Sequence, residues 1–158
     1  NTLPLLYGGG QEAGLRPGTE ATAQIAGFAK AAALRRQCLE ETWRHLADCR
    51  AYAAERLGEI PDLCFVGRGD APHILSVSLP GYPSQNIVSE LSGKGICISA
   101  GSACHRGRVS HVLSAMGLDK KTAAGTVRVS FGPETTREDI DQLASALLEH
   151  RRTRFPML

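Results

Sequence analysis

The stretch Thr126-Val127-Arg128-Val129-Ser130-Phe131 decides much of the expected fold, because its side chains alternate between apolar and polar. Such alternation predicts a β-strand whose apolar side chains share one face and pack into a core. Arg128 and Ser130 then lie on the opposite face. A guanidinium between core-facing residues needs water, a cleft or an anion on its own side, and it suits the two oxygens of a carboxylate. The pattern leaves two roles open for Arg128: an anion receptor or a surface charge on an edge strand.

The segments around this strand predict a small sheet covered by helices. Short apolar or alternating runs, bounded by glycine and proline, predict further strands at residues 63–66, 73–79 and 96–98. Apolar residues at helical spacing predict short helices capped by Ser84 and by Ser110. Thr135 and Glu138 have the spacing of a capping box, which predicts the start of a last helix.

A longer helix is expected before the sheet. Helical periodicity predicts one continuous helix from Glu20 to Leu57, ended by Gly58 and Pro61. Its expected apolar stripe consists of Ile25, Phe28, Ala32, Leu39, Trp43, Leu46, Ala53 and Leu57. The fold class is therefore α+β, with a long N-terminal helix and a small sheet with covering helices.

Length and composition predict a soluble globular protein. The chain has 158 residues, of which 42% are hydrophobic and 22% charged, and its formal net charge is +2. These ordinary values favour no polyanionic partner, so we expect no nucleic-acid binding. Without a bilayer-spanning apolar run or a signal-peptide pattern, we expect no membrane contact and a cytoplasmic location. Five cysteines cannot all pair within one chain, which favours reduced thiols.

One of these thiols lies in the small-residue stretch Ile98-Ser99-Ala100-Gly101-Ser102-Ala103-Cys104-His105-Arg106-Gly107. Lacking bulky apolar neighbours, Cys104 is expected on an exposed loop. His105, Arg106 and Arg108 can favour its nucleophilic thiolate form. A reactive thiol and an inert loop thiol remain equally open at this point.

The other cysteines are expected to be inert or packed; they are Cys38, Cys49, Cys64 and Cys97. Cys97 is expected inside the strand at residues 96–98. Cys97 and Cys104, taken with His105 and His111, do not match the spacing of a common zinc site, so we expect no metal.

A glycine-rich stretch at residues 8–18 precedes Thr19 and the expected long helix. Backbone N–H groups of such a loop, with a hydroxyl at a helix start, can bind a phosphate. Thr19 has a second open role as a simple N-cap. A dinucleotide site is not expected, because Pro17 and Gly18 interrupt the helix that its fingerprint requires.

Three stretches together resemble the NifS/IscS-type cysteine desulfurases, which are class-V aminotransferase-like enzymes. Residues 8–20 resemble their glycine-rich signature, residues 99–104 their catalytic-cysteine loop, and residues 127–136 their C-terminal strand and helix start. The resemblance implies the C-terminal domain of an aminotransferase-like, fold type I enzyme. It assigns residues 1–20 to a glycine-rich segment on the large-domain side, and 21–158 to a connecting helix and a small domain.

The resemblance also implies a chemistry that depends on pyridoxal 5′-phosphate. Cys104 would take sulfur from L-cysteine as a persulfide and release alanine, while Arg128 binds the substrate carboxylate. Thr19 would reach the cofactor phosphate of the neighbouring subunit, which implies a homodimer. A sulfur acceptor or Fe–S scaffold protein would receive the sulfur, for Fe–S cluster or thio-cofactor assembly. Selenocysteine is equally compatible as a substrate.

Two departures from the family pattern matter. The lysine that forms the family's Schiff base with the cofactor lies upstream of the glycine-rich signature, and no lysine of this chain has that context. We therefore expect the C-terminal part of an enzyme, inactive alone. His105-Arg106-Gly107 differs from the more familiar Thr-Ser continuation, which leaves the acceptor open. A docking module for a sulfur acceptor and a redox-sensing thiol protein remain alternative interpretations.

Overall fold

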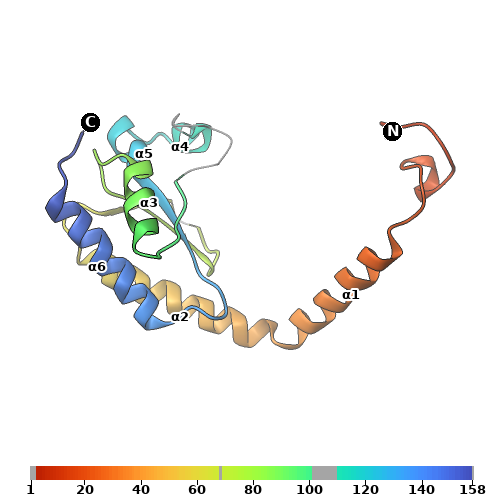
Figure 1. Ribbon diagram of the computed structural model, residues 1–158, viewed down its shortest axis with the longest axis horizontal. Helices are drawn as coiled ribbons and strands as arrows, with labels where there is room; N and C mark the ends of the chain where they lie inside the picture. Colours follow the sequence, from red (N-terminus) through yellow and green to blue (C-terminus); the bar gives the residue numbers. More distant parts are fainter. Residues whose placement is uncertain (1–2, 68, 101–109, 158) are drawn as a thin grey trace. The chain divides into compact units, whose positions relative to one another are not determined.

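The structure is a computed structural model that describes residues 3–67, 69–100 and 110–157. The chain divides into two compact units, Asn1–Leu39 and Glu40–Leu158. The first contains a 3₁₀ turn, η1 (Glu12–Gly14), and helix α1 (Thr22–Gln37) (Figure 1). The boundary after residue 20 expected from the sequence refers to a longer enzyme and stays a prediction.

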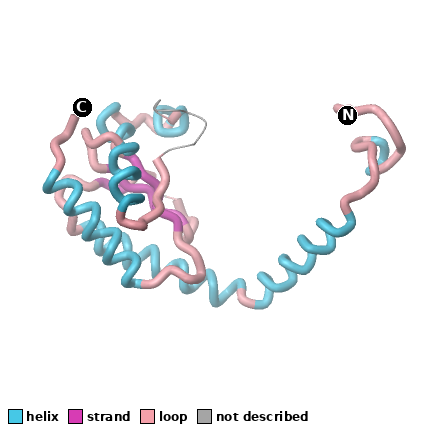
Figure 2. Tube along the Cα trace, in the orientation of Figure 1, coloured by secondary structure: helices cyan, strands magenta, loops and turns pink. Residues whose placement is uncertain are grey.

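The second unit is a three-stranded antiparallel sheet with helices packed around it (Figure 2). The strands are β1 (Cys64–Phe65), β2 (Ile74–Ser78) and β3 (Thr126–Ser130), in that order across the sheet. The helices are α2 (Leu39–Gly58), α3 (Ser84–Gly93), α4 (His111–Ala115), α5 (Lys120–Ala124) and α6 (Arg137–Thr153). The predicted α+β class is confirmed, as are the strands expected around residues 63–66, 73–79 and 126–131.

One face of the sheet forms the hydrophobic core. Val127 and Val129 of β3 lie opposite Val77 and Leu75 of β2, and all four side chains are buried. Helices α2, α3 and α6 contribute buried residues to the same core, including Leu57, Ile87, Leu91 and Leu147. Each fully buried leucine or isoleucine contributes about 1.5–3 kcal/mol, so this face holds the second unit together.

The opposite face of the sheet is polar. Ser76 lies opposite Arg128, and Ser78 lies opposite Thr126. At one end α5 covers this face, since the hydroxyls of Ser78 and Thr126 donate to the carbonyl oxygen of Thr122 at 2.6 and 2.7 Å. Arg128 stays exposed, so the alternation predicted from the sequence is confirmed.

The expected single helix is wrong, because the chain forms two helices separated at Cys38. The φ and ψ of Cys38 are −114° and 12°, and its N–H donates to Arg35 instead of continuing the α-helical pattern. The apolar stripe is buried only from Leu46 onward, whereas Phe28 and Trp43 are exposed. A helix of α1's length is marginal without packing, and none of its residues is buried within the described chain.

Two other local predictions are corrected. Residues 96–98 do not form a strand. Of residues 96–99, only Ser99 pairs with β3, and Cys97 is exposed instead of packed. Ser84 is the first residue of α3 rather than its cap, because Pro83 occupies the N-cap position. Ser110 does cap α4, as predicted, by accepting from the N–H of Val112.

The short helix α5 was not expected from the sequence, because five residues are too few to show helical periodicity. The available signal is Asp119, whose carboxylate accepts from the N–H groups of Lys121 and Thr122 at 2.9 and 3.1 Å. An aspartate at that position is a strong N-cap.

The capping box of α6 lies one residue later than predicted, at Thr136 and Asp139 rather than Thr135 and Glu138. Asp139 Oδ2 accepts from the backbone N–H and the hydroxyl of Thr136, at 2.9 and 2.8 Å. Thr135 instead accepts from the N–H of Gly132 at 2.9 Å. The hydrogen bonds from Thr136, first from its N–H and then from its hydroxyl, lower the pKa of Asp139.

We expect Asp139→Asn to destabilise the protein in a pH-dependent way. Because folding lowers the pKa of Asp139, its stabilising effect is present above the unfolded value of about 3.9 and is lost as pH falls through the folded value. Urea unfolding of native and D139N proteins should therefore differ near neutral pH and converge in acid. Glu138→Gln is the control. An equal loss of stability in E138Q and D139N would contradict the capping box formed by Thr136 and Asp139.

Gly125→Ala should destabilise the fold strongly. A Cβ at Gly125, between α5 and β3, would lie 2.0 Å from the carbonyl oxygen of Leu79, a backbone atom that cannot simply rotate away. The expected loss in unfolding free energy is about 1–3 kcal/mol, by chemical denaturation. Gly93→Ala is the matched control, since no heavy atom of the described residues beyond its chain neighbours and its own helix backbone lies within 4 Å of its added Cβ. Equal losses in the two variants would show that the close approach at Leu79 is not responsible.

Candidate functional site

Arg128 lies at the centre of β3 on the polar face, and its backbone is paired with Ser99. The N–H of Arg128 donates to the Ser99 oxygen at 2.7 Å, and the N–H of Ser99 donates to the Arg128 oxygen at 3.1 Å. This antiparallel bridge stands alone outside the named strands of the described chain. It holds the start of the cysteine-containing stretch beside the predicted substrate-binding arginine.

The side chains around Arg128 are small and polar. Ser76 lies directly opposite it in β2, and Ser130 lies two residues along the same face of β3. Within residues 3–67, 69–100 and 110–157, no ion pair involves the guanidinium of Arg128. Such a guanidinium, on an exposed face lined by hydroxyls, can bind a carboxylate through two parallel hydrogen bonds. Both roles left open by the sequence, anion receptor and surface charge on an edge strand, are compatible with this geometry, because Arg128 is exposed and β3 is at one edge of the three-stranded sheet.

Cys104 lies outside the described residues, as do His105, Arg106 and Arg108. The predicted role of Cys104 therefore stays a prediction. Sequence reasoning did not single out Ser99 or Ser76, because nothing in the sequence states which residue of another segment faces Arg128. Only the pairing register supplies that information.

The glycine-rich segment forms a compact turn in the first unit. Arg16 Nη1 donates to the carbonyl oxygens of Gly18 and Thr19 at 3.1 Å each, and the N–H of Gly18 donates to Gln11 Oε1 at 3.3 Å. Gly18 has a φ of +98°, a conformation that favours glycine. The turn therefore depends on both the glycine and the arginine of this stretch.

Thr19 is exposed and does not cap the helix. Helix α1 begins at Thr22, its N-cap is Ala21, and no side chain accepts a capping hydrogen bond there. The N-cap role considered for Thr19 is therefore wrong. An exposed hydroxyl beside a glycine-rich turn has the donor chemistry that a phosphate requires, and the predicted cofactor role of Thr19 stays a prediction.

The described thiols other than Cys97 have structural surroundings. Burial raises the pKa of Cys49, whose Sγ donates to the carbonyl oxygen of Thr135 at 3.6 Å. Burial also raises the pKa of Cys64. A raised pKa reduces the thiolate population at neutral pH, so neither thiol is suited to nucleophilic attack. Cys38 Sγ donates to the backbone carbonyls of Leu34 and Arg35 in α1, the helix that Cys38 follows.

Metal-binding clusters and membrane-spanning helices are both absent from the described part of the chain. No group of three or more His, Cys, Asp or Glu side chains there is arranged to hold a metal ion. No helix among those residues has the length and apolarity needed to cross a membrane.

Comparison with known proteins shows the family to which the chain belongs. The family model "Aminotransferase class-V" matches residues 4–143. A cysteine desulfurase IscS from Clostridium botulinum is 34% identical over 163 residues, which cover 97% of this chain and 41% of the relative. A human selenocysteine lyase is 36% identical over 154 residues, which cover 91% of this chain and 35% of that protein. This chain thus spans less than half the length of these relatives.

The solved structures point the same way. The structure of a NifS-like protein from Rickettsia africae matches with a TM-score of 0.83 and 28% sequence identity, covering 96% of this chain and 40% of that one. The agreement extends over both the helical segments and the small sheet. The chain therefore belongs to the aminotransferase class-V family, in which it is similar to the NifS/IscS-type cysteine desulfurases.

Proposed function

We propose that this chain is the C-terminal part of a pyridoxal-phosphate-dependent cysteine desulfurase and supplies its sulfur-accepting thiol and its carboxylate-binding arginine. The observation that supports this most directly is the backbone bridge between Ser99 and Arg128. Cys104 follows Ser99 by five residues, a length of chain that reaches at most about 18 Å. The length of chain between Ser99 and Cys104 therefore allows the thiol and the guanidinium to act on the same substrate molecule.

The proposed reaction uses both groups on one molecule of L-cysteine. Arg128 binds the substrate carboxylate and so orients the substrate sulfur. The thiolate of Cys104 attacks that sulfur: the new S–S bond forms as the substrate Cβ–S bond breaks. The electron pair of the broken bond stays with the carbon skeleton, which takes up a proton and leaves as alanine. Cys104 is left as a persulfide.

Pyridoxal phosphate, when bound, supplies the electron sink that makes the substrate Cβ–S bond cleavable. The hydroxyl of Thr19 and the backbone N–H groups of the glycine-rich turn are the groups of this chain that would hold its phosphate. We propose that they do so for the neighbouring subunit of a homodimer. The lysine that carries the cofactor would come from outside this chain, so the chain alone would be inactive.

The sulfane sulfur of the Cys104 persulfide would pass to a sulfur-acceptor or Fe–S scaffold protein in the cytoplasm, for Fe–S cluster or thio-cofactor assembly. Selenocysteine lyase is the second candidate, favoured by the 36% identity to the human protein of that name. Both substrates carry the carboxylate that Arg128 would bind, so the described residues serve either reaction.

Cys104→Ser should abolish alanine release in a preparation that combines this chain with the lysine-bearing domain and pyridoxal phosphate. We expect the rate to fall roughly 10³-fold or more, because serine cannot accept sulfane sulfur. Alanine is measured by amino-acid analysis, and persulfide on the protein by mass spectrometry.

Cys97→Ser is the matched control, since Cys97 is an exposed thiol seven residues earlier. It should keep near-native activity. Persulfide on Cys97, or a fully active C104S protein, would refute the assignment. Alanine release by the 158-residue chain alone with added pyridoxal phosphate would instead refute the proposal that the lysine comes from elsewhere.

Arg128→Gln should raise the KM for L-cysteine by about 10- to 100-fold, since charge-assisted hydrogen bonds contribute about 1.5–3 kcal/mol. Cysteamine, which lacks the carboxylate, should inhibit the native and R128Q enzymes equally in steady-state assays. Ser130→Ala, on the same face of β3, is the control and should change the KM less than about twofold. If R128Q weakens inhibition by cysteamine as much as it weakens binding of L-cysteine, Arg128 has a structural role instead.

A further inference from the structure

A cavity lies at the end of α6, and its lining shares no residue with the site described above. Its volume is about 680 Å³, within the range of about 300–1,000 Å³ that small-molecule sites occupy. Its walls come from Tyr82 and Pro83, from one side of α3, from His150 of α6, and from three C-terminal residues, Arg154, Phe155 and Met157.

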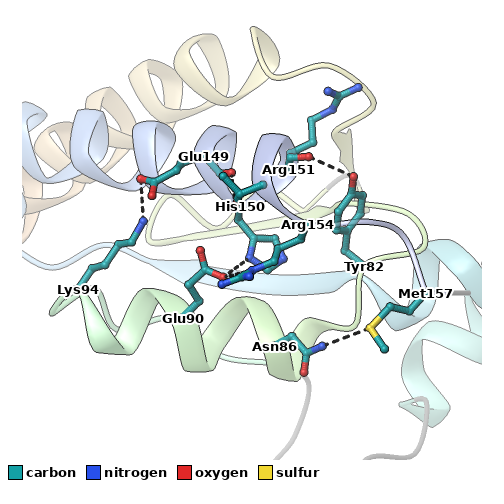
Figure 3. A network of polar contacts seen from close by, with 10 residues as sticks. Tyr82, Asn86, Glu90, Lys94, Glu149, His150, Arg151, Arg154 and Met157 are labelled. Carbon is teal, nitrogen blue, oxygen red and sulfur yellow. Dashed lines mark hydrogen bonds and ion pairs between the residues drawn. The ribbon is translucent and has the colours of Figure 1, made fainter.

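The C-terminal wall of this cavity is tied to the fold. The N–H of Met157 donates to the carbonyl oxygen of Gly81 at 2.8 Å, and Arg154 Nε donates to Glu90 Oε2 at 3.0 Å. Figure 3 shows Glu90, Arg154 and Met157 near the end of α6. The segment is therefore positioned by specific hydrogen bonds and can form one side of a binding site.

The cavity lining includes a polar pair, the buried His150 and the half-buried Glu90. His150 is 2% exposed, and its Nδ1 lies 3.0 Å from Glu90 Oε2 (Figure 3). The ring of Tyr82 packs edge-to-face on His150, with centroids 5.8 Å apart. The hydrogen bonds from Arg154 and His150 lower the pKa of Glu90, so this carboxylate is ionised and matched by the charge of Arg154.

The guanidinium of Arg154 retains a free edge. Glu90 engages only its Nε, and within the described residues no hydrogen bond or ion pair involves its Nη1 or Nη2. Arg151 pairs with Asp62, whereas no ion pair of the exposed Arg152 is found in that part of the chain. Arg151 and Arg152 lie outside the cavity lining, so Arg154 is the described residue that brings a guanidinium to the cavity itself. The two Nη groups suit both oxygens of a carboxylate or phosphate.

Apolar and aromatic side chains flank this guanidinium. Phe155 and Met157 line the cavity although they are 86% and 70% exposed, and Tyr82 and Pro83 line it from another segment. Aromatic rings that remain open to solvent can bury surface by contact with another ring. The cavity thus combines ring-binding walls with an anion-binding edge.

We propose that this cavity binds a small aromatic anion, with the ring of the ligand contacting Tyr82 and Phe155 and its carboxylate or phosphate on Nη1 and Nη2 of Arg154. The proposal rests on residues that take no part in the sulfur chemistry, so its outcome does not depend on that function.

Calorimetric titration of the purified protein with benzoate and with phenyl phosphate tests this. At least one of them should bind about fivefold or more tightly than benzyl alcohol, which lacks the charge, and than acetate or inorganic phosphate, which lack the ring. The tighter of the two identifies the preferred anion. Equal binding of benzyl alcohol, or equal binding of the ring-free anions, would overturn the proposal.

Arg154→Gln should reduce the affinity for the aromatic anion to that for benzyl alcohol. Arg152→Gln makes the same charge change two residues away, outside the cavity lining, and should change affinity less than about twofold. Phe155→Ala removes an exposed ring without disturbing the core and should also weaken binding. Equal losses in R154Q and R152Q, with circular dichroism showing both folded, would mean non-specific charge attraction and would overturn the proposal.

Discussion

Val127 and Val129 cannot enter the core without turning Arg128 away from it, because successive side chains of a strand point to opposite faces. This constraint organises the second unit. The apolar face of the sheet is closed by α2, α3 and α6, with Leu57, Ile87 and Leu147 fully buried. The same strand must then present a cation on its other face. In this small domain, packing and the placement of a candidate binding group have a single cause.

The pairing of Ser99 with Arg128 adds the second element of the site. Two backbone hydrogen bonds join Ser99 to Arg128 of β3. Because these bonds involve main-chain atoms, they position the start of the Cys104 stretch whatever the side chains around it are. In the proposed function, the sulfur-accepting thiol follows this pairing by five residues.

The two units differ in how they are stabilised. The second has a closed core, and α2 and α6 are also joined by Asp141, which accepts from Tyr52 and Arg56. In residues 3–39 no side chain is buried, and the first unit depends on local contacts such as those of Arg16. Helix α1 therefore lacks the tertiary packing that gives most helices their stability. Helical periodicity alone predicted one helix where the chain forms two, because the residues on both sides of Cys38 are helical.

The sequence by itself determined the alternating strand at residues 126–131, the strand at 73–79, the last helix and the three stretches that resemble cysteine desulfurases, because each depends on local spacing. It could not determine which segment lies beside Arg128, that Thr136 rather than Thr135 caps α6, or that Cys97 is exposed. Those features depend on pairing register and on which surfaces other elements cover. The cavity at the end of α6 is the clearest case. Only tertiary folding brings its lining residues together from distant parts of the chain, among them Tyr82, Glu90, His150 and Arg154.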